Sequence, residues 1–439
     1  MFQVWRENEG PAVAAMKGAP EAVLSLCYLE PAEHERVIGR ASALAAQGMR
    51  VLAVAEAVVP DHAAPNITSL KFTLLGLVGF RDPVRDSVPV AIRECGAAGI
   101  RVVMITGDYP ETARAIAKEA GLNAAELLTG SEINGLDDDA LRARLRTCDV
   151  FARILPEQKL RIVELLKANG EIVAMTGDGV NDAPSLRAAH IGIAMGGRGT
   201  DVAREASSIV LLDDDFSSIV KTIRLGRRIY DNLQKAMGYV LSVHIPIAGM
   251  AILPLLFGAP PIMTPAIVAF LEMVIDPACS IVFEAEPEER TIMSRPPRDP
   301  RIRLLHRDLL ISSVLQGVVA LLGVAIVYSA IASDRPVTDV RALMLVVITA
   351  ANIALIFSHR SLHSSLRETF DGRNPWLWFG IAGVAAILAV TLTVPSVGGL
   401  FHLGAPDLVD LGFAAITISA LSLALLLMNA WWESRHRMH

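Results

Sequence analysis

The stretch EIVAMTGDGVNDAPSL, residues 171–186, decides the fold of the first half of the chain. An apolar run leads directly into TGDG, as at the carboxyl end of a buried parallel strand, where such sheets place their ligand sites. Gly177 and Gly179 allow the backbone to approach a ligand closely. Asp178 and Asp182 are carboxylates four residues apart, which suit a Mg²⁺ ion that takes its remaining ligands from phosphate. The stretch therefore predicts a magnesium and phosphate site at a sheet edge.

Two further segments carry side chains of the same chemistry. Lys159, in PEQKLRIV, can neutralise phosphoryl oxygens as charge develops during transfer. VVMITGDYPETARAIA presents Thr106, Gly107 and Asp108 before a helix whose N-terminal amides can receive an anion. The plainer alternative for the two aspartates of TGDGVND is a solvated loop with helix-capping acids.

The order of apolar runs predicts the domains. Residues 80–222 alternate short apolar runs with helical patterns, which is typical of a Rossmann-like α/β domain around a buried parallel sheet. Residues 1–79 form part of an α/β lobe, and 223–439 form a stalk followed by an all-α transmembrane domain. Six stretches approach or exceed the length that spans the hydrocarbon core of a bilayer. They lie near 236–257, 262–283, 309–332, 340–358, 376–395 and 408–432.

Composition and charge narrow the class of protein. The net charge is −6, and no basic run is interleaved with aromatic residues, so nucleic acid is not an expected partner. The four cysteines show no CxxC spacing, which argues against a disulfide framework and a zinc site. Arginines gather after the second and fourth spans and in the tail, and no export signal opens the chain. We therefore expect a multi-pass protein of a bacterial plasma membrane, with the head and both termini in the cytosol.

Two acids stand inside the second predicted span. Glu272 and Asp276 are one helical turn apart, and a charge at mid-bilayer costs about 2.5–3.5 kcal/mol on insertion scales, so both need a cation, a proton or a polar partner. We assign them to a transported cation. His244 in the first span and Asn352 in the fourth are further candidate ligands, although a packing histidine and a helix-to-helix hydrogen bonder are the commoner roles.

The strings KGAPE, TGD, PEQK and TGDGVNDAPSL together resemble the P-type cation-transporting ATPases, whose phosphorylation domain has the haloacid-dehalogenase fold. The resemblance covers essentially the whole chain and implies ATP and Mg²⁺ as cofactors. It places Lys17 and Arg50 at the ATP site and Asp82 at the hinge between lobes. For the remaining positions it implies phosphate and nucleotide contacts from Thr106, Gly107 and Asp108, a nucleotide contact from Arg153, phosphoryl binding by Lys159, Mg²⁺ ligation by Asp178, and support from Asn181 and Asp182.

The chain also departs from that family. Its pumps phosphorylate an aspartate in a DKTGT motif, and no DKTGT occurs in these 439 residues. A TGES-bearing actuator lobe and four earlier membrane helices are missing as well, and the similar string TGSE at residues 129–132 falls inside the predicted phosphorylation domain. The resemblance thus implies a pump fragment that does not complete a cycle alone, with an upstream polypeptide supplying the rest.

The transported ion and two other functions stay open. Calcium pumps of the family carry Asn where Glu272 stands, whereas sodium and proton exchangers place two acids with this spacing, so calcium, sodium and protons all remain candidates. A membrane protein that binds nucleotide without turnover is one alternative function. A membrane-anchored phosphatase of the haloacid-dehalogenase type is another, but it too needs a nucleophilic aspartate.

Overall fold

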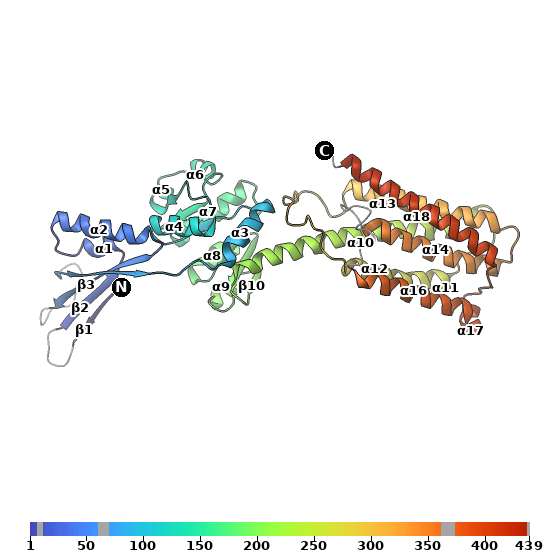
Figure 1. Cartoon of the computed structure of the whole chain (residues 1–439), viewed down its shortest axis with the longest axis horizontal. Coiled ribbons are helices and arrows are strands. Elements are labelled where there is room, and N and C mark those ends of the chain that lie inside the picture. Colours follow the sequence, from blue (N-terminus) through green and yellow to red (C-terminus); the bar gives the residue numbers. More distant parts are fainter. Residues whose placement is uncertain (7–11, 60–69, 361–373, 437–439) are drawn as a thin grey trace. The chain divides into compact units, whose positions relative to one another are not determined.

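The structure is a computed structural model that describes residues 1–6, 12–59, 70–360 and 374–436 (Figure 1). Within these ranges, the side chains of residues 274–276, 278–279 and 433–436 are outside the description. The chain divides into two compact units. The first is Met1–Thr222 with Met293–Pro296, and the second is Ile223–Ile292 with Pro297–His439.

The first unit begins with an antiparallel sheet of four strands in the order β1-β2-β3-β4. The strands are β1 (Phe2–Trp5), β2 (Ala12–Gly18), β3 (Arg50–Val59) and β4 (Thr73–Phe80). The helices α1 (Pro20–Leu24) and α2 (Pro31–Ala45) both begin on a proline, which suits the first helical turn because no amide hydrogen is needed there. Both helices pack on the sheet (Figure 1). Alternate side chains of β2 and β3 are buried in the core between them.

Two parallel sheets follow, each of three strands. The first has the order β5-β7-β6, from β5 (Met104–Ile105), β7 (Val150–Ala152) and β6 (Leu128–Thr129). The second has the order β8-β9-β10, from β8 (Ala174–Gly177), β9 (Ile191–Met195) and β10 (Ile209–Leu211). The prediction of one continuous parallel sheet therefore differs from the structure. In the described ranges β5 pairs only with β7 and β8 only with β9, so each ends its own sheet.

Helices connect these strands. They are α3 (Ser87–Ala97), α4 (Pro110–Ala120), α5 (Gly130–Asn134), α6 (Asp138–Arg144), α7 (Pro156–Ala168), α8 (Ala183–Ala188) and α9 (Asp201–Glu205). The TGSE string caps α5: Thr129 accepts from the Glu132 amide, and the Glu132 carboxylate accepts from the Thr129 amide at 2.7 Å. The Thr129 hydroxyl also donates to this carboxylate at 2.7 Å, and this bond, followed by the bond from the Thr129 amide, holds the pKa of Glu132 below its usual value. The string is thus the start of a helix in the structure.

The second unit is helical. Its helices are α10 (Phe216–Leu256, which begins in the first unit), α11 (Pro265–Phe270), the π-helix η2 (Leu271–Ile275), α12 (Asp276–Glu284), α13 (Arg307–Ile331), α14 (Val337–Arg360), α16 (Pro375–Thr393), α17 (Pro395–Leu400) and α18 (Leu408–His436). By length and composition, five helices of the described chain are able to cross a membrane: α10, α13, α14, α16 and α18. The predicted second span is the run α11, η2 and α12, so the count of six spans stays a prediction.

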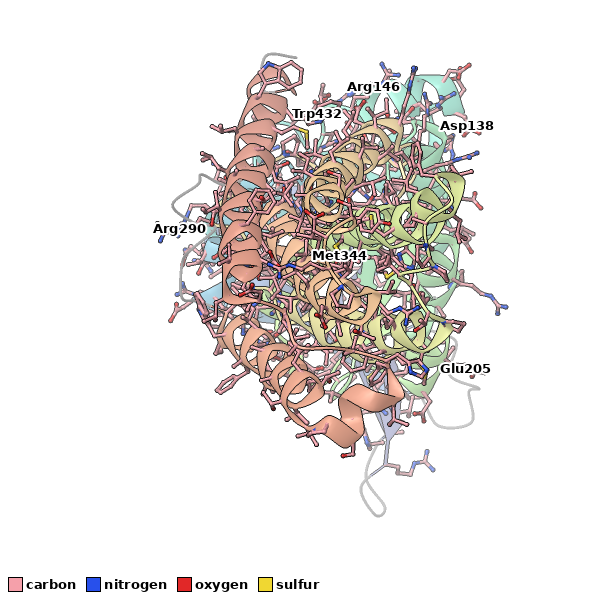
Figure 2. The ribbon with its side chains drawn as sticks, turned by 90° about the vertical axis from the view of Figure 1, so that its right-hand side faces the viewer. Asp138, Arg146, Glu205, Arg290, Met344 and Trp432 are labelled. Carbon is pink, nitrogen blue, oxygen red and sulfur yellow. The ribbon has the colours of Figure 1, made fainter. Side chains whose placement is uncertain are left out.

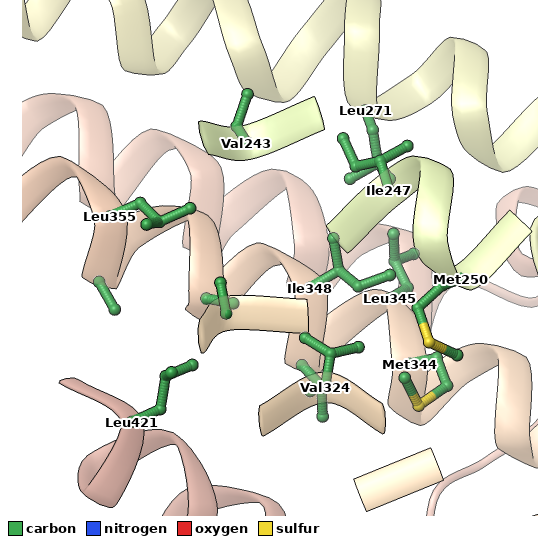
Figure 3. Packing of buried hydrophobic residues seen from close by; sticks show 14 of the residues in the cluster. Val243, Ile247, Met250, Leu271, Val324, Met344, Leu345, Ile348, Leu355 and Leu421 are labelled. Carbon is green, nitrogen blue, oxygen red and sulfur yellow. The ribbon is translucent and has the colours of Figure 1, made fainter. Parts of the chain in front are cut away.

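The core of the second unit forms around α14. Its side chains Met344, Leu345 and Ile348 are almost fully buried and meet Met250 of α10 and Val324 of α13 (Figure 3). Figure 2 shows Met344 amid the helices. By contrast, α16 and α18 leave large apolar and aromatic side chains exposed. An apolar surface of this kind suits contact with lipid rather than water.

A buried ion pair joins the helix ends of this unit. Arg360, the last residue of α14, binds both carboxylate oxygens of Glu286 at 3.1–3.2 Å, and Asn374 donates to one of them at 2.6 Å. The Glu286 carbonyl in turn accepts from Arg228 and Asn232 of α10 at 3.0 and 2.9 Å. Every oxygen of Glu286 is therefore satisfied, which is what a buried carboxylate requires.

We predict that Arg360→Met destabilises the second unit by about 3–5 kcal/mol, because it leaves the Glu286 carboxylate buried without its cation. Thermal unfolding of the full chain in detergent measures the change. Arg335→Met is the matched control, since Arg335 pairs with Asp407 and Asp410 in partly exposed positions where water screens the charges. Equal losses of stability in the two variants would contradict the prediction.

Candidate functional site

The centre of the candidate phosphate site is an ion pair between α7 and the 3₁₀ turn η1 (Val180–Asp182) that follows β8. Lys159 Nζ lies 2.6 Å from Asp182 Oδ1, and the two side chains are only 18% and 10% exposed. The second oxygen of Asp182 accepts from the Gly179 amide at 3.2 Å. Both oxygens of Asp182 are thus engaged within the protein, and the ammonium group of Lys159 is held beside the end of β8.

The TGDG turn leaves no room for a side chain at its first glycine. A Cβ on Gly177 would lie 2.6 Å from the Asp182 Cβ, closer than such atoms approach. Asp178 and Asn181 are exposed, and within the described ranges no hydrogen bond or ion pair involves the Asp178 carboxylate. Asp178 is therefore the carboxylate free to bind a ligand, while Asp182 positions the lysine.

This donor set fits Mg²⁺. The described residues contain no group of three or more His, Cys, Asp or Glu side chains able to surround a metal ion. Mg²⁺ is commonly held by one or two carboxylates, with water and substrate phosphate as its other ligands. Asp178 and Asp182 supply these one or two carboxylates.

A cavity of about 240 Å³ lies between the antiparallel sheet and the TGD turn after β5. Of the predicted nucleotide residues, Arg50, Gly107, Asp108 and Arg153 line it. Thr106 is not in the lining, but its hydroxyl donates to Asp108 Oδ2 at 3.1 Å. The two other predicted residues are not in the lining: the side chains of Lys17 at the end of β2 and Asp82 after β4 are both exposed.

Charged and aromatic groups meet across this cavity. Arg153 Nη2 lies 3.4 Å from Glu21 Oε2, and its guanidinium carbon stands 5.0 Å from the centre of the Tyr109 ring. Arg50 Nε is 3.8 Å from Asp108 Oδ1. Arg153 has φ of 56°, a left-handed conformation that is uncommon for residues other than glycine and marks functional positions. Two arginines beside an aromatic ring suit a ligand with both phosphate and a flat base.

Sequence reasoning missed two residues of the cavity. Glu21 closes the KGAPE string, and Tyr109 directly follows TGD, so proximity to those motifs was the available signal. The pKa of the Tyr109 hydroxyl is raised by burial and then by its hydrogen bond to the Glu21 carboxylate. Tyr109 and Glu21 come from opposite walls of the cavity, which periodicity alone does not reveal.

In the second unit, the structure brings together two of the predicted cation ligands. His244 Nε2 of α10 lies 3.3 Å from Glu272 Oε1 of η2. Asn352 of α14 is fully buried, and both polar atoms of its side chain lack a hydrogen-bond partner within the described chain, as does the nearby Thr349 hydroxyl. The side chain of Asp276 lies outside the described residues.

Comparison with known proteins finds related sequences for both halves of the chain. The haloacid dehalogenase-like hydrolase family matches residues 2–190, and the family described as the C-terminus of cation transporting ATPases matches residues 260–433. The "Probable cation-transporting ATPase F" of Mycobacterium tuberculosis is 35% identical over 90% of this chain and 46% of its own length. The chain belongs to the P-type cation-transporting ATPases.

Other relatives differ in their named cation. The "Calcium-transporting ATPase" of Bacillus subtilis is 35% identical over 88% of this chain and 45% of its own length. The "Sodium/potassium exporting P-type ATPase cta3" of Schizosaccharomyces pombe is 34% identical over 72% and 33%. This P-type ATPase chain therefore spans about half the length, or less, of these curated relatives. With its five long apolar helices, it is a multi-pass membrane protein.

We predict that Gly177→Ala destabilises the first unit by about 1–3 kcal/mol, because the new methyl group overlaps Asp182 and disturbs its pair with Lys159. Calorimetry of the full chain measures the change. Gly107→Ala is the matched control, since a Cβ there meets only the Ile154 carbonyl oxygen at 3.9 Å. A larger loss at Gly107 than at Gly177 would contradict this account of the turn.

Proposed function

We propose that this chain forms the nucleotide-binding, phosphate-binding and cation-binding parts of an ATP-driven cation pump. The observation that carries the proposal is the arrangement after β8, where Lys159 is held by Asp182 and the Asp178 carboxylate is free. It is the charge pattern that phosphoryl transfer needs, with one cation and one metal-binding carboxylate at the same turn. The family membership of the chain and the curated relatives support this function.

Each residue has a distinct role in this proposal. Lys159 contacts phosphoryl oxygens and neutralises the charge that develops on them, and Asp182 keeps its ammonium group in place. The Asp178 carboxylate holds Mg²⁺, which shields phosphate charge when bound. Asn181, exposed next to Asp182, supports the turn from the solvent side. None of these residues is a phosphoryl acceptor.

Nucleotide binding belongs to the cavity of the first unit. Arg50 and Arg153 present guanidinium groups to phosphates, and the Tyr109 ring offers a flat apolar face to a base. Thr106, Gly107 and Asp108 form the turn between that cavity and the end of β5. Lys17 and Asp82 take part only after a movement of the lobe, because neither lines the cavity as it stands.

The pump part lies in the membrane unit, with six spans when α11, η2 and α12 cross together and with the first unit in the bacterial cytosol. Glu272, Asp276 and His244 form its cation site, and Asn352 is an interior polar position beside the path. Because the sequence has no DKTGT string, the phosphorylated aspartate comes in this proposal from another segment or polypeptide. Without it, we expect the chain to bind nucleotide and not to hydrolyse it.

The absence of a DKTGT string from this sequence also favours a second function. In it, the protein binds a nucleotide and regulates another process without hydrolysing the nucleotide. Co-expression separates the two. A polypeptide that carries a DKTGT segment and the N-terminal part of a relative is combined with this chain, and aspartyl phosphate formation from ATP is followed. Phosphorylation that requires Lys159 supports the pump, whereas its absence in a stable complex supports the regulator.

For the nucleotide site, we predict that Arg153→Ala weakens binding of a non-hydrolysable ATP analogue to the full chain by roughly 10- to 150-fold. This is the loss of a charge-assisted contact of about 1.5–3 kcal/mol. Isothermal titration calorimetry in detergent with Mg²⁺ gives the dissociation constants. Arg146→Ala is the control, because Arg146 is exposed and away from the cavity lining (Figure 2). Equal affinity in wild type and Arg153→Ala would remove Arg153 from the site.

For the cation site, we predict that Glu272→Gln and Asp276→Asn each lower cation binding by the solubilised full chain at least about tenfold, since each removes an anionic ligand. Binding is measured by equilibrium dialysis with Ca²⁺, Mn²⁺ and Na⁺. Glu284→Gln, an exposed acid at the end of α12, is the matched control. Unchanged binding in both site variants would sink the assignment.

A further inference from the structure

The orientation of the His244 ring is fixed by its own helix. Its Nδ1 lies 2.7 Å from the Val240 carbonyl oxygen, one turn earlier in α10. A carbonyl oxygen only accepts hydrogen bonds, so Nδ1 carries the proton and donates it. In the neutral imidazole, Nε2 is then left with a lone pair. The backbone therefore holds His244 in the tautomer that binds a metal ion through Nε2.

The Nε2 atom of His244 lies close to a carboxylate. Nε2 of His244 lies 3.3 Å from Oε1 of Glu272, and two acceptors at this distance repel unless something positive stands between them. Glu272 and Asp276 are the only Asp, Glu, Lys or Arg residues in the sequence from residue 239 to residue 283. Neither α10 nor the second predicted span therefore offers a Lys or Arg side chain at this level to pair with Glu272.

The spacing of the two atoms suits chelation. Ligands about 2.0–2.2 Å from a tetrahedral ion such as Zn²⁺ lie roughly 3.3–3.5 Å apart, which is the separation found here. Glu272 is in η2, where the helix widens to π geometry, and single π turns inside α-helices are frequent at functional sites. The second ring nitrogen, Nδ1, donates to a backbone carbonyl, which is also a usual outer partner of a metal-binding histidine.

We propose that His244 and Glu272 bind a divalent transition-metal cation, through one imidazole nitrogen and one carboxylate oxygen. The inference rests on the proposed function, in which Glu272 belongs to the transported-cation site, and it names the class of cation. Imidazole is a ligand for zinc, cobalt, nickel and similar ions, whereas Ca²⁺ takes six to eight oxygens and gains little from nitrogen. Calcium and sodium, named for two relatives, are then poorer occupants of this pair than Zn²⁺ or Co²⁺.

The test uses the full chain in detergent, with Co²⁺ as a spectroscopic probe and Zn²⁺ and Ca²⁺ as competitors. We expect the visible absorption of Co²⁺ to change on binding as an imidazole enters its coordination, and Zn²⁺ to abolish that absorption at far lower concentration than Ca²⁺. His244→Ala should weaken Co²⁺ and Zn²⁺ binding at least about tenfold, with little effect on any Ca²⁺ binding. His34→Ala, on α2 of the first unit, is the matched control.

The outcomes separate the two proposals. If Glu272→Gln and Asp276→Asn abolish Co²⁺ binding while His244→Ala leaves it unchanged, the nitrogen ligand is wrong and the cation site stands. If His244→Ala and Glu272→Gln abolish Co²⁺ binding while Asp276→Asn leaves it unchanged, the metal pair stands and the wider acidic site does not. Displacement of Co²⁺ by Ca²⁺ as readily as by Zn²⁺ overturns the inference. Failure of the correctly folded chain to bind Co²⁺ at all also overturns the inference. That result is expected if His244 and Glu272 only share a proton.

Discussion

The pair between Lys159 and Asp182 is the interaction on which the TGDG turn after β8 depends. An ammonium and a carboxylate at 2.6 Å, both mostly withdrawn from water, are costly unless each satisfies the other. Asp182 is held in turn by the Gly179 amide, and Gly177 is small because the Asp182 side chain fills the space beside it. This turn thus holds the ammonium group of Lys159 in place and leaves the Asp178 carboxylate available to a ligand. It also requires a glycine at position 177. The TGDGVND string is distinctive because Gly177, Gly179 and Asp182 fit one another in this way.

The second constraint is the direction of parallel strands. Because β5 and β8 are parallel strands of their sheets, each delivers its loop at a carboxyl end, and both loops contain the Thr-Gly-Asp order. Each strand also ends its sheet, with one edge that no described strand pairs.

Many of the secondary-structure elements could be predicted from the sequence, because local sequence patterns indicate local structure. The strand within EIVAM, the helix of PEQKLRIV and the unbroken run from the stalk into the membrane appear as β8, α7 and α10. The sequence could not show contacts between residues far apart in the chain. Periodicity does not show that β5 and β8 lack a shared neighbour, that Tyr109 meets Glu21, or that Arg360 binds Glu286, 74 residues earlier. The π-helix η2 could not be predicted for a different reason. Nothing in its five residues distinguishes a π-helix from an α-helix.

Polar groups inside the membrane unit divide into two kinds. Glu286 has a partner for each oxygen, so its charge is consumed in joining helix ends. Glu272 lies 3.3 Å from His244 Nε2, and Asn352 has no partner for either polar atom of its side chain in the described chain. An unmet polar group in an apolar interior costs free energy. In the proposed function, the partner that Asn352 lacks is the transported ion and its water, and the same ion is bound by His244 and Glu272.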